Sequence, residues 1–98
     1  MSQNPADAVA VQTSDNVATL LRAVRQGETV AVACGGARFD VVAEQDIAFC
    51  HKIALTDLTP GDRILKYGEP IGEATLRIAA GAWVHVHNMQ SLRGRAPG

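Results

Sequence analysis

The sequence predicts a mostly β domain with one short amphipathic helix near its N-terminus. From residue 29 onward, short apolar segments alternate with Gly- and Pro-containing turns, which is the pattern of β-strands. The length of 98 residues supports one small domain and leaves no room for two. Only 4% of the residues are aromatic, so the core is expected to consist of Val, Ile, Leu and Ala.

The N-terminal part is expected to contain a lead-in and then the helix. Residues 1–13 are polar and Ala-rich, which predicts a weakly ordered segment outside the domain. Ser14 or Asp15 is a suitable N-cap, and Gly27 is placed to end the helix. The apolar residues between them recur at helical spacing: Val17, Leu20, Leu21 and Val24.

The remaining elements are predicted as strands of a domain that covers 14–92. Thr29–Cys34 and Arg38–Val42 should form a hairpin around Gly35-Gly36. Further strands are expected at 53–55, 63–67, 71–76 and 83–88, with turns at 59–62, 68–70 and 80–81. We expect no internal repeat, and 93–98 should be a flexible tail.

Charge and cysteine content exclude several classes of function. The net charge is -1, and the only basic cluster, Arg93 and Arg95, lies in the tail, which argues against nucleic-acid binding. No segment approaches the roughly 20 apolar residues of a membrane span. The N-terminus has no signal-peptide pattern, and Cys34 and Cys50 lack C-x-x-C spacing, so a cytoplasmic protein with reduced thiols is expected.

The segment from Trp83 to Asn88 is the strongest candidate for chemistry. In a strand, Trp83, His85 and His87 line one face, while Val84 and Val86 face the core. Imidazoles serve as acids, bases or metal ligands. A catalytic metal site usually has three protein ligands, so the third would come from His51, an acidic residue or a partner. The alternative is an edge strand whose histidines have no special role.

Three further residue types are weaker candidates. Lys66, beside Tyr67, can hold a carboxylate, although a solvated lysine is the simpler interpretation. Asn88 can orient a substrate hydroxyl or form a turn with its own backbone. His51 or Lys52 should lie on the side of the histidine row, and the sequence does not decide which.

Three motifs together resemble the altronate/galactarate dehydratase family. They are HKIAL at 51–55, KYGEPIG at 66–72 and HVHN at 85–88, in this order and at this spacing. The resemblance runs from about Asp15 to about Ser91 and implies the N-terminal SAF-type module of that family, with a β-clip fold. One departure concerns the residues before His51, where the family usually has Gly and this chain has Phe49-Cys50.

The resemblance implies the small subunit of a hydro-lyase, beside a large catalytic dehydratase subunit. The pair would remove water from a sugar acid and give a 2-keto-3-deoxy acid, using a divalent metal, Fe(II) or Mn(II), held mainly by the large subunit. His85 and His87 would act as an acid/base pair or as metal ligands. The substrate would contact four residues: Lys66, Tyr67, Asn88 and His51.

Two other functions stay open, as does a homo-oligomer. The small subunit of sulfolactate sulfo-lyase also carries an H-V-H-N segment, and the β-clip architecture also occurs in binding modules without catalysis. An independent enzyme is not expected, because 98 residues offer too few candidate ligands and bases.

Overall fold

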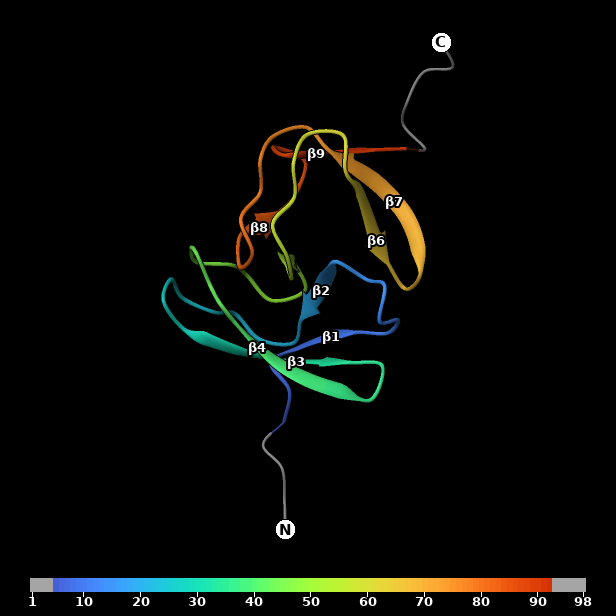
Figure 1. Cartoon of the computed structure of the whole chain (residues 1–98). Helices are drawn as coiled ribbons and strands as arrows, with labels where there is room; N and C mark the ends of the chain where they lie inside the picture. The colour runs from blue at the N-terminus through green and yellow to red at the C-terminus, as the bar shows by residue number, and fades with distance from the viewer. Residues whose placement is uncertain (1–4, 93–98) are drawn as a thin grey trace.

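The protein is built from two β-sheets (Figure 1). The computed structural model describes residues 5–92, which contain no helix and therefore none that could span a membrane. Nine strands are present in this range: β1 (Ala8–Ala10), β2 (Val17–Leu20), β3 (Thr29–Cys34), β4 (Ala37–Val42), β5 (Lys52–Ala54), β6 (Arg63–Lys66), β7 (Glu69–Ala74), β8 (Trp83–Val84) and β9 (Met89–Ser91). The first sheet has the order β4-β3-β1-β2-β5-β8, and the second has the order β6-β7-β9.

The predicted helix is wrong, because Val17–Leu20 forms β2. This strand pairs with β1 on one side and β5 on the other. Val17 lies in one hydrophobic core, whereas Leu20 lies in another. A strand buried on both faces carries a continuous apolar run, and over four residues such a run cannot be told from helical spacing.

The expected lead-in is also wrong where it includes Ala8–Ala10, which forms β1. This strand lies inside the larger sheet, parallel to β3 and antiparallel to β2. Its Ala8 and Ala10 side chains are buried. Alanine gives no strand signal in the sequence, so only the pairing with distant strands reveals this element. Residues 1–4 and the predicted tail, 93–98, lie outside the described residues.

The later strands follow the predictions closely. The hairpin of β3 and β4 around Gly35-Gly36 is confirmed. The turn expected at 68–70 lies one residue earlier, at Tyr67-Gly68, so that Pro70 belongs to β7.

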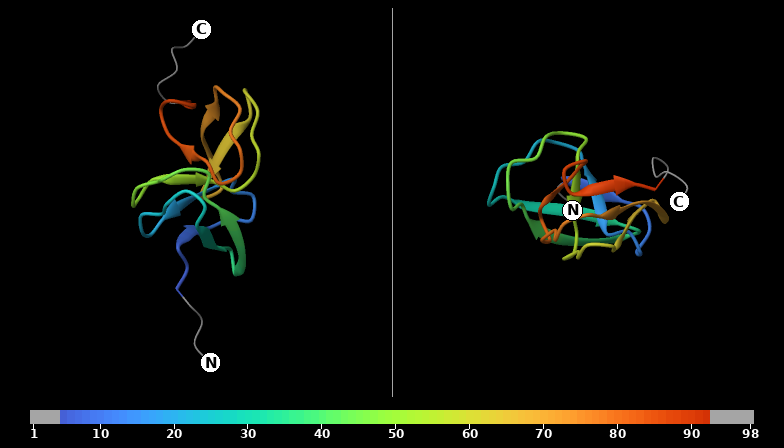
Figure 2. Two further views of the ribbon diagram at one scale, coloured as in Figure 1. Left: turned by 90° about the vertical axis from the view of Figure 1, so that its left-hand side faces the viewer. Right: turned by 90° about the horizontal axis from the view of Figure 1, so that it is seen from above.

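Two hydrophobic cores lie on the two faces of the β2–β5 pair. Ala18 and Ile53 belong to the first core, under the six-stranded sheet. Val17 and Ala54 belong to the second, where the three-stranded sheet packs. In both views the strands β6, β7 and β9 therefore lie apart from β3 and β4, with β2 between them (Figure 1 and Figure 2).

The backbone contains a repeat that the side chains conceal. Four segments, at 24–28, 47–51, 58–62 and 78–82, each begin with an apolar residue in an isolated β-bridge. Each continues into a four-residue turn closed by a backbone hydrogen bond of 3.0 to 3.2 Å, and each is followed by a strand or leads directly into one. The expectation of no internal repeat is therefore wrong. The repeat is one of backbone form, and few side chains are shared.

The third residue of each turn has a positive φ, as a type II turn requires. Three of these positions are glycines: Gly27, Gly61 and Gly81, with φ of 87°, 93° and 90°. The fourth is Cys50, with φ of 71°. Its thiol is free and exposed, whereas the free thiol of Cys34 is buried. Cys50 therefore adopts a strained conformation at the position where the family usually has Gly.

Asp15 is a buried anchor between the two sheets and does not cap a helix. Its Oδ2 accepts hydrogen bonds from the N–H groups of Val11, Gln12 and Tyr67, at 3.0 to 3.1 Å. Its Oδ1 accepts one from the N–H of Gly68 at 2.7 Å. Burial opposes the charge, but these four donors outweigh it and hold the pKa of Asp15 below its ordinary value.

We predict that Cys50→Gly stabilises the protein. Glycine adopts positive φ without steric cost, so the free energy of unfolding should rise by about 0.5–1 kcal/mol after the greater entropy of the unfolded chain is subtracted. Gly61→Ala is the matched control, because a Cβ there meets nothing within 4 Å and only the backbone conformation changes. It should lower stability by about 1 kcal/mol. Urea unfolding that shows Cys50→Gly to be destabilising would contradict this account of the turn.

We predict that Asp15→Asn lowers stability in a pH-dependent way. The amide places an NH2 group against backbone donors, so the expected loss is about 2–3 kcal/mol at neutral pH. Because the folded pKa of Asp15 is depressed, its contribution is complete above the unfolded pKa of about 4 and is lost as the pH falls through the folded value. The difference between the variant and the wild type should therefore shrink in acid. Asp40→Asn, in the exposed strand β4, serves as the control, and a pH-independent difference would refute the prediction.

Candidate functional site

Trp83, His85 and His87 gather as the sequence analysis expected. The ring of His85 stacks on Trp83, with centroids 5.2 Å apart and planes 11° apart. The ring of His87 lies against the same indole at 4.8 Å, tilted by 41°. His85 is half-buried and His87 is exposed. The indole thus forms a common surface for two imidazoles.

A turn, and not an extended strand, brings these rings together. β8 ends at Val84, and residues 85–88 form a turn. Val84 is completely buried, as predicted, but Val86 is 76% exposed, so the predicted alternation fails after Val84. The local hydrogen bonds of the turn replace the missing strand pairing.

Asn88 closes this turn with its side chain. Its Nδ2 donates to the carbonyl of Trp83 at 2.8 Å, and its Oδ1 accepts from the N–H of His85 at 2.9 Å. Its own N–H donates to the carbonyl of His85 at 3.1 Å, and the residue is only 6% exposed. The structure therefore supports the interpretation in which Asn88 forms a turn with the backbone. Contact with a substrate hydroxyl stays a prediction.

His51 joins the cluster from a distant part of the chain. Ile53 is paired with Trp83 across β5 and β8, so alternation along β5 puts His51 on the side of the indole. Trp83 Nε1 donates to His51 Nδ1 at 3.0 Å, and the rings of His51 and His85 are 5.1 Å apart. Because an indole nitrogen can only donate, His51 Nδ1 is unprotonated and Nε2 carries the proton. The sequence analysis missed this role of Trp83.

A pocket of about 510 Å3 lies beside the cluster. His51 and Trp83 form part of its wall. The rest comes from the first two repeated turns and the residues next to them: Ala23, Val24, Arg25, Asp46, Ile47 and Ala48. Its lining is mostly apolar, with two charged residues.

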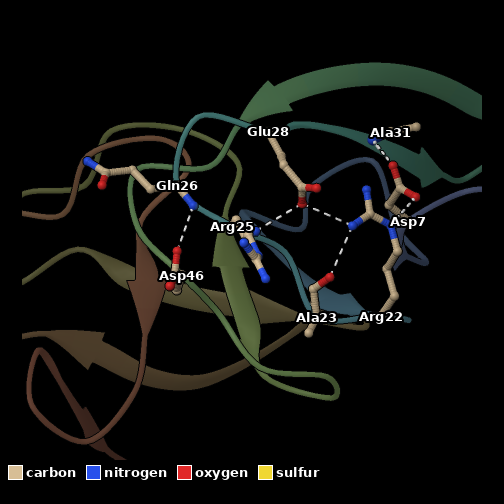
Figure 3. A network of polar contacts seen from close by, with 8 residues as sticks. All are labelled: Asp7, Arg22, Ala23, Arg25, Gln26, Glu28, Ala31 and Asp46. Atoms are coloured by element: carbon tan, nitrogen blue, oxygen red, sulfur yellow. Dashed lines mark hydrogen bonds and ion pairs between the residues drawn. The ribbon is translucent and has the colours of Figure 1, made fainter.

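A polar network holds the first of these turns in place (Figure 3). Arg22 forms ion pairs with Asp7 at 2.9 Å and with Glu28 at 3.0 Å. The hydrogen bond from Arg22 is the main reason that the pKa of Asp7 lies below its ordinary value. Asp46 accepts a hydrogen bond from the N–H of Gln26 at 2.9 Å and so ties the first turn to the second. The pocket wall is therefore fixed by charged side chains outside it.

Lys66 and Tyr67 lie with Lys52, away from the imidazoles. Lys66 Nζ is 5.0 Å from the centroid of the Tyr67 ring. Burial lowers the pKa of Lys52, and the charge of Lys66 lowers it further. Lys52 is paired with Val84, while Trp83 is paired with Ile53, so the side chains of Lys52 and Trp83 point to opposite faces of the sheet. The predicted site residues thus form two groups.

The histidines do not complete a metal site within this chain. Among residues 5–92, no group of three or more His, Cys, Asp or Glu side chains is arranged to hold a metal ion. The donors that the described residues offer would fill only part of a coordination shell.

Comparison with known proteins agrees with the three motifs. A family model for the altronate/galactarate dehydratase SAF domain matches residues 6–92. Altronate dehydratase from Escherichia coli K12 is 41% identical over 83 residues, which are 85% of this chain and 16% of that protein. Altronate dehydratase from Bacillus subtilis 168 is 37% identical over the same shares. The chain therefore spans less than a fifth of the length of these relatives.

A second kind of relative is much shorter. The (2R)-sulfolactate sulfo-lyase subunit alpha of Paracoccus pantotrophus is 40% identical over 55 residues, which are 56% of this chain and 82% of that protein. The chain is thus similar both to one part of a large dehydratase and to most of a small lyase subunit.

We predict that Trp83→Phe releases the tautomer of His51. Phenylalanine keeps an aromatic ring against His85 and His87 but removes the donor to His51 Nδ1, at a cost of about 1 kcal/mol. Long-range proton–nitrogen NMR spectra should then show the Nδ1 and Nε2 signals of His51 moving toward each other. Val86→Ala, which alters an exposed side chain in the same turn, should leave them unchanged. An unaltered His51 spectrum in Trp83→Phe would disprove the assignment.

Proposed function

The chain belongs to the altronate/galactarate dehydratase SAF domain family, and we propose that it is the small subunit of a sugar-acid dehydratase of the altronate/galactarate type. Its two-sheet architecture is accordingly a SAF-type β-clip. A large catalytic subunit is its partner. The similarity to most of a lyase subunit alpha supports a separate-subunit form, and the short match within altronate dehydratases supports the need for a larger catalytic part.

The cluster of imidazoles is the observation that carries this proposal. Elimination of water from a sugar acid needs a base for the proton next to the carboxylate and an acid for the departing hydroxyl. His85 and His87 meet this need, since both rings rest on one indole and His87 is exposed to a partner. A neutral imidazole takes the proton, and an imidazolium returns one to the leaving oxygen, which departs as water.

The other members of the cluster position these two rings. Asn88 holds the backbone of His85, and Trp83 supports both rings. His51 contacts His85 and presents Nε2–H as a donor to a substrate oxygen. A divalent metal, Fe(II) or Mn(II), held mainly by the large subunit, would stabilise negative charge on the substrate as a Lewis acid.

A sulfo-lyase is the second candidate function. It is favoured by the short relative, of which this chain covers 82%. The large subunit and the substrate would then differ, while the same histidines would serve as acid and base.

We predict that His85→Ala and His87→Ala abolish most of the activity of the assembled enzyme. The chain is co-expressed with the large subunit of its own organism, and formation of a 2-keto-3-deoxy acid from altronate and galactarate is assayed beside sulfite release from sulfolactate. Loss of a general acid or base should lower kcat by about 100-fold or more, with the complex intact.

Val86→Ala is the matched control, since it lies between the two histidines and is exposed. It should retain activity. A chain that assembles but whose histidine variants keep kcat within a few-fold of wild type would be a binding module without a catalytic role. Sulfite release without dehydration would favour the second candidate.

A further inference from the structure

The two lysines of this chain are brought together by the fold. Lys52 and Lys66 are the only lysines in the sequence. They belong to different sheets, in β5 and β6. Asn16 joins these sheets, because its side chain donates to the carbonyl of Arg63 at 2.8 Å and accepts from the N–H of Leu65 at 2.8 Å. Its carbonyl also accepts from the N–H of Leu55 at 2.9 Å.

The two ammonium groups lie close enough to repel each other and have no acidic partner. The ion pairs formed within 5–92 both involve Arg22. Glu69 is paired with Lys66 across the hairpin but forms no ion pair with it. Lys52 is half-buried, and burial together with the charge of Lys66 disfavours its protonated form. An anion between the two groups would remove this repulsion.

A buried hydroxyl group on the same face also lacks a partner. Thr19 is paired with Lys52 across β2 and β5, so the two side chains project from the same face of the sheet. Thr19 Oγ1 is the one buried side-chain polar atom without a hydrogen bond among the described residues. An unsatisfied buried hydroxyl costs about 1–3 kcal/mol, and a ligand oxygen held at Lys52 would give it an acceptor.

Tyr67 adds a strained and exposed aromatic ring. Its φ is 56°, a left-handed conformation that is costly for a bulky residue and is imposed by the hydrogen bonds to Asp15. Its side chain is 49% exposed, and the ring lies against the ammonium of Lys66. This contact orients Lys66 without neutralising its charge.

We propose that Lys52 and Lys66, with Thr19 beside them, bind a carboxylate of a small acid. The site lies on the face of the sheet opposite to Trp83 and His51. It rests on the proposed function for the identity of the ligand, a sugar acid, and it adds Lys52 as the main determinant of carboxylate recognition.

The test measures binding of galactarate to the chain by itself. Because there are only two lysines, their Cε and Nζ NMR signals can be followed separately. Galactarate should shift both signals in a saturable manner, whereas galactitol, which lacks carboxylates, and potassium chloride at equal ionic strength should not. Lys52→Met should lower the affinity about tenfold or more, and Lys52→Arg should restore part of it.

Two controls separate this site from general charge and from the proposed function. Arg77→Met removes a positive charge at an exposed position in the β7–β8 connection and should bind galactarate as the wild type does. His85→Ala should also bind normally. No lysine shift, an equal shift with galactitol, or unchanged affinity in Lys52→Met would overturn the site. Loss of dehydratase function with intact galactarate binding would instead remove the proposed function and leave the site.

Discussion

A single buried carboxylate, that of Asp15, determines how the two sheets of this domain are joined. It lies between β1 and β2 of the larger sheet and is bound by the turn between β6 and β7 of the smaller one. Backbone N–H groups stabilise the charge, so no basic side chain is needed in the interior. The same contacts hold Tyr67 in its left-handed conformation and place Lys66 beside Lys52. Fold and surface chemistry thus depend on one side chain.

The repeated type II turn explains how distant residues meet. Each turn directs the chain into a strand, and the second and fourth turns deliver β5 and β8 to neighbouring places in the sheet. His51 is the last residue of the second turn, and Trp83 follows the fourth. Their hydrogen bond therefore joins residues 32 positions apart. A repeat that serves folding also assembles the imidazole cluster.

The alternation of β5 divides the chemistry of the domain between two faces. The imidazoles and the mostly apolar pocket lie on the face of Ile53, and the two ammonium groups lie on the face of Val84. An apolar lining offers few hydrogen bonds to a polyhydroxy acid. The polar contacts that such a ligand needs must then come from the lysine face or from another chain, which agrees with the proposed role as a subunit.

The sequence by itself determined the features that depend on neighbours along the chain. These are the β3–β4 hairpin, the positions of most turns, the contact of His85 and His87 with Trp83, and the family, through its three motifs. It did not reveal β1 or β2, whose small or doubly buried residues acquire strand form only by pairing with distant segments. Nor did it reveal the bond between His51 and Trp83 or the meeting of Lys52 with Lys66. Only the tertiary structure decides such contacts, because strand order and the side chains' choice of face arise from long-range pairing and burial, which local periodicity does not record.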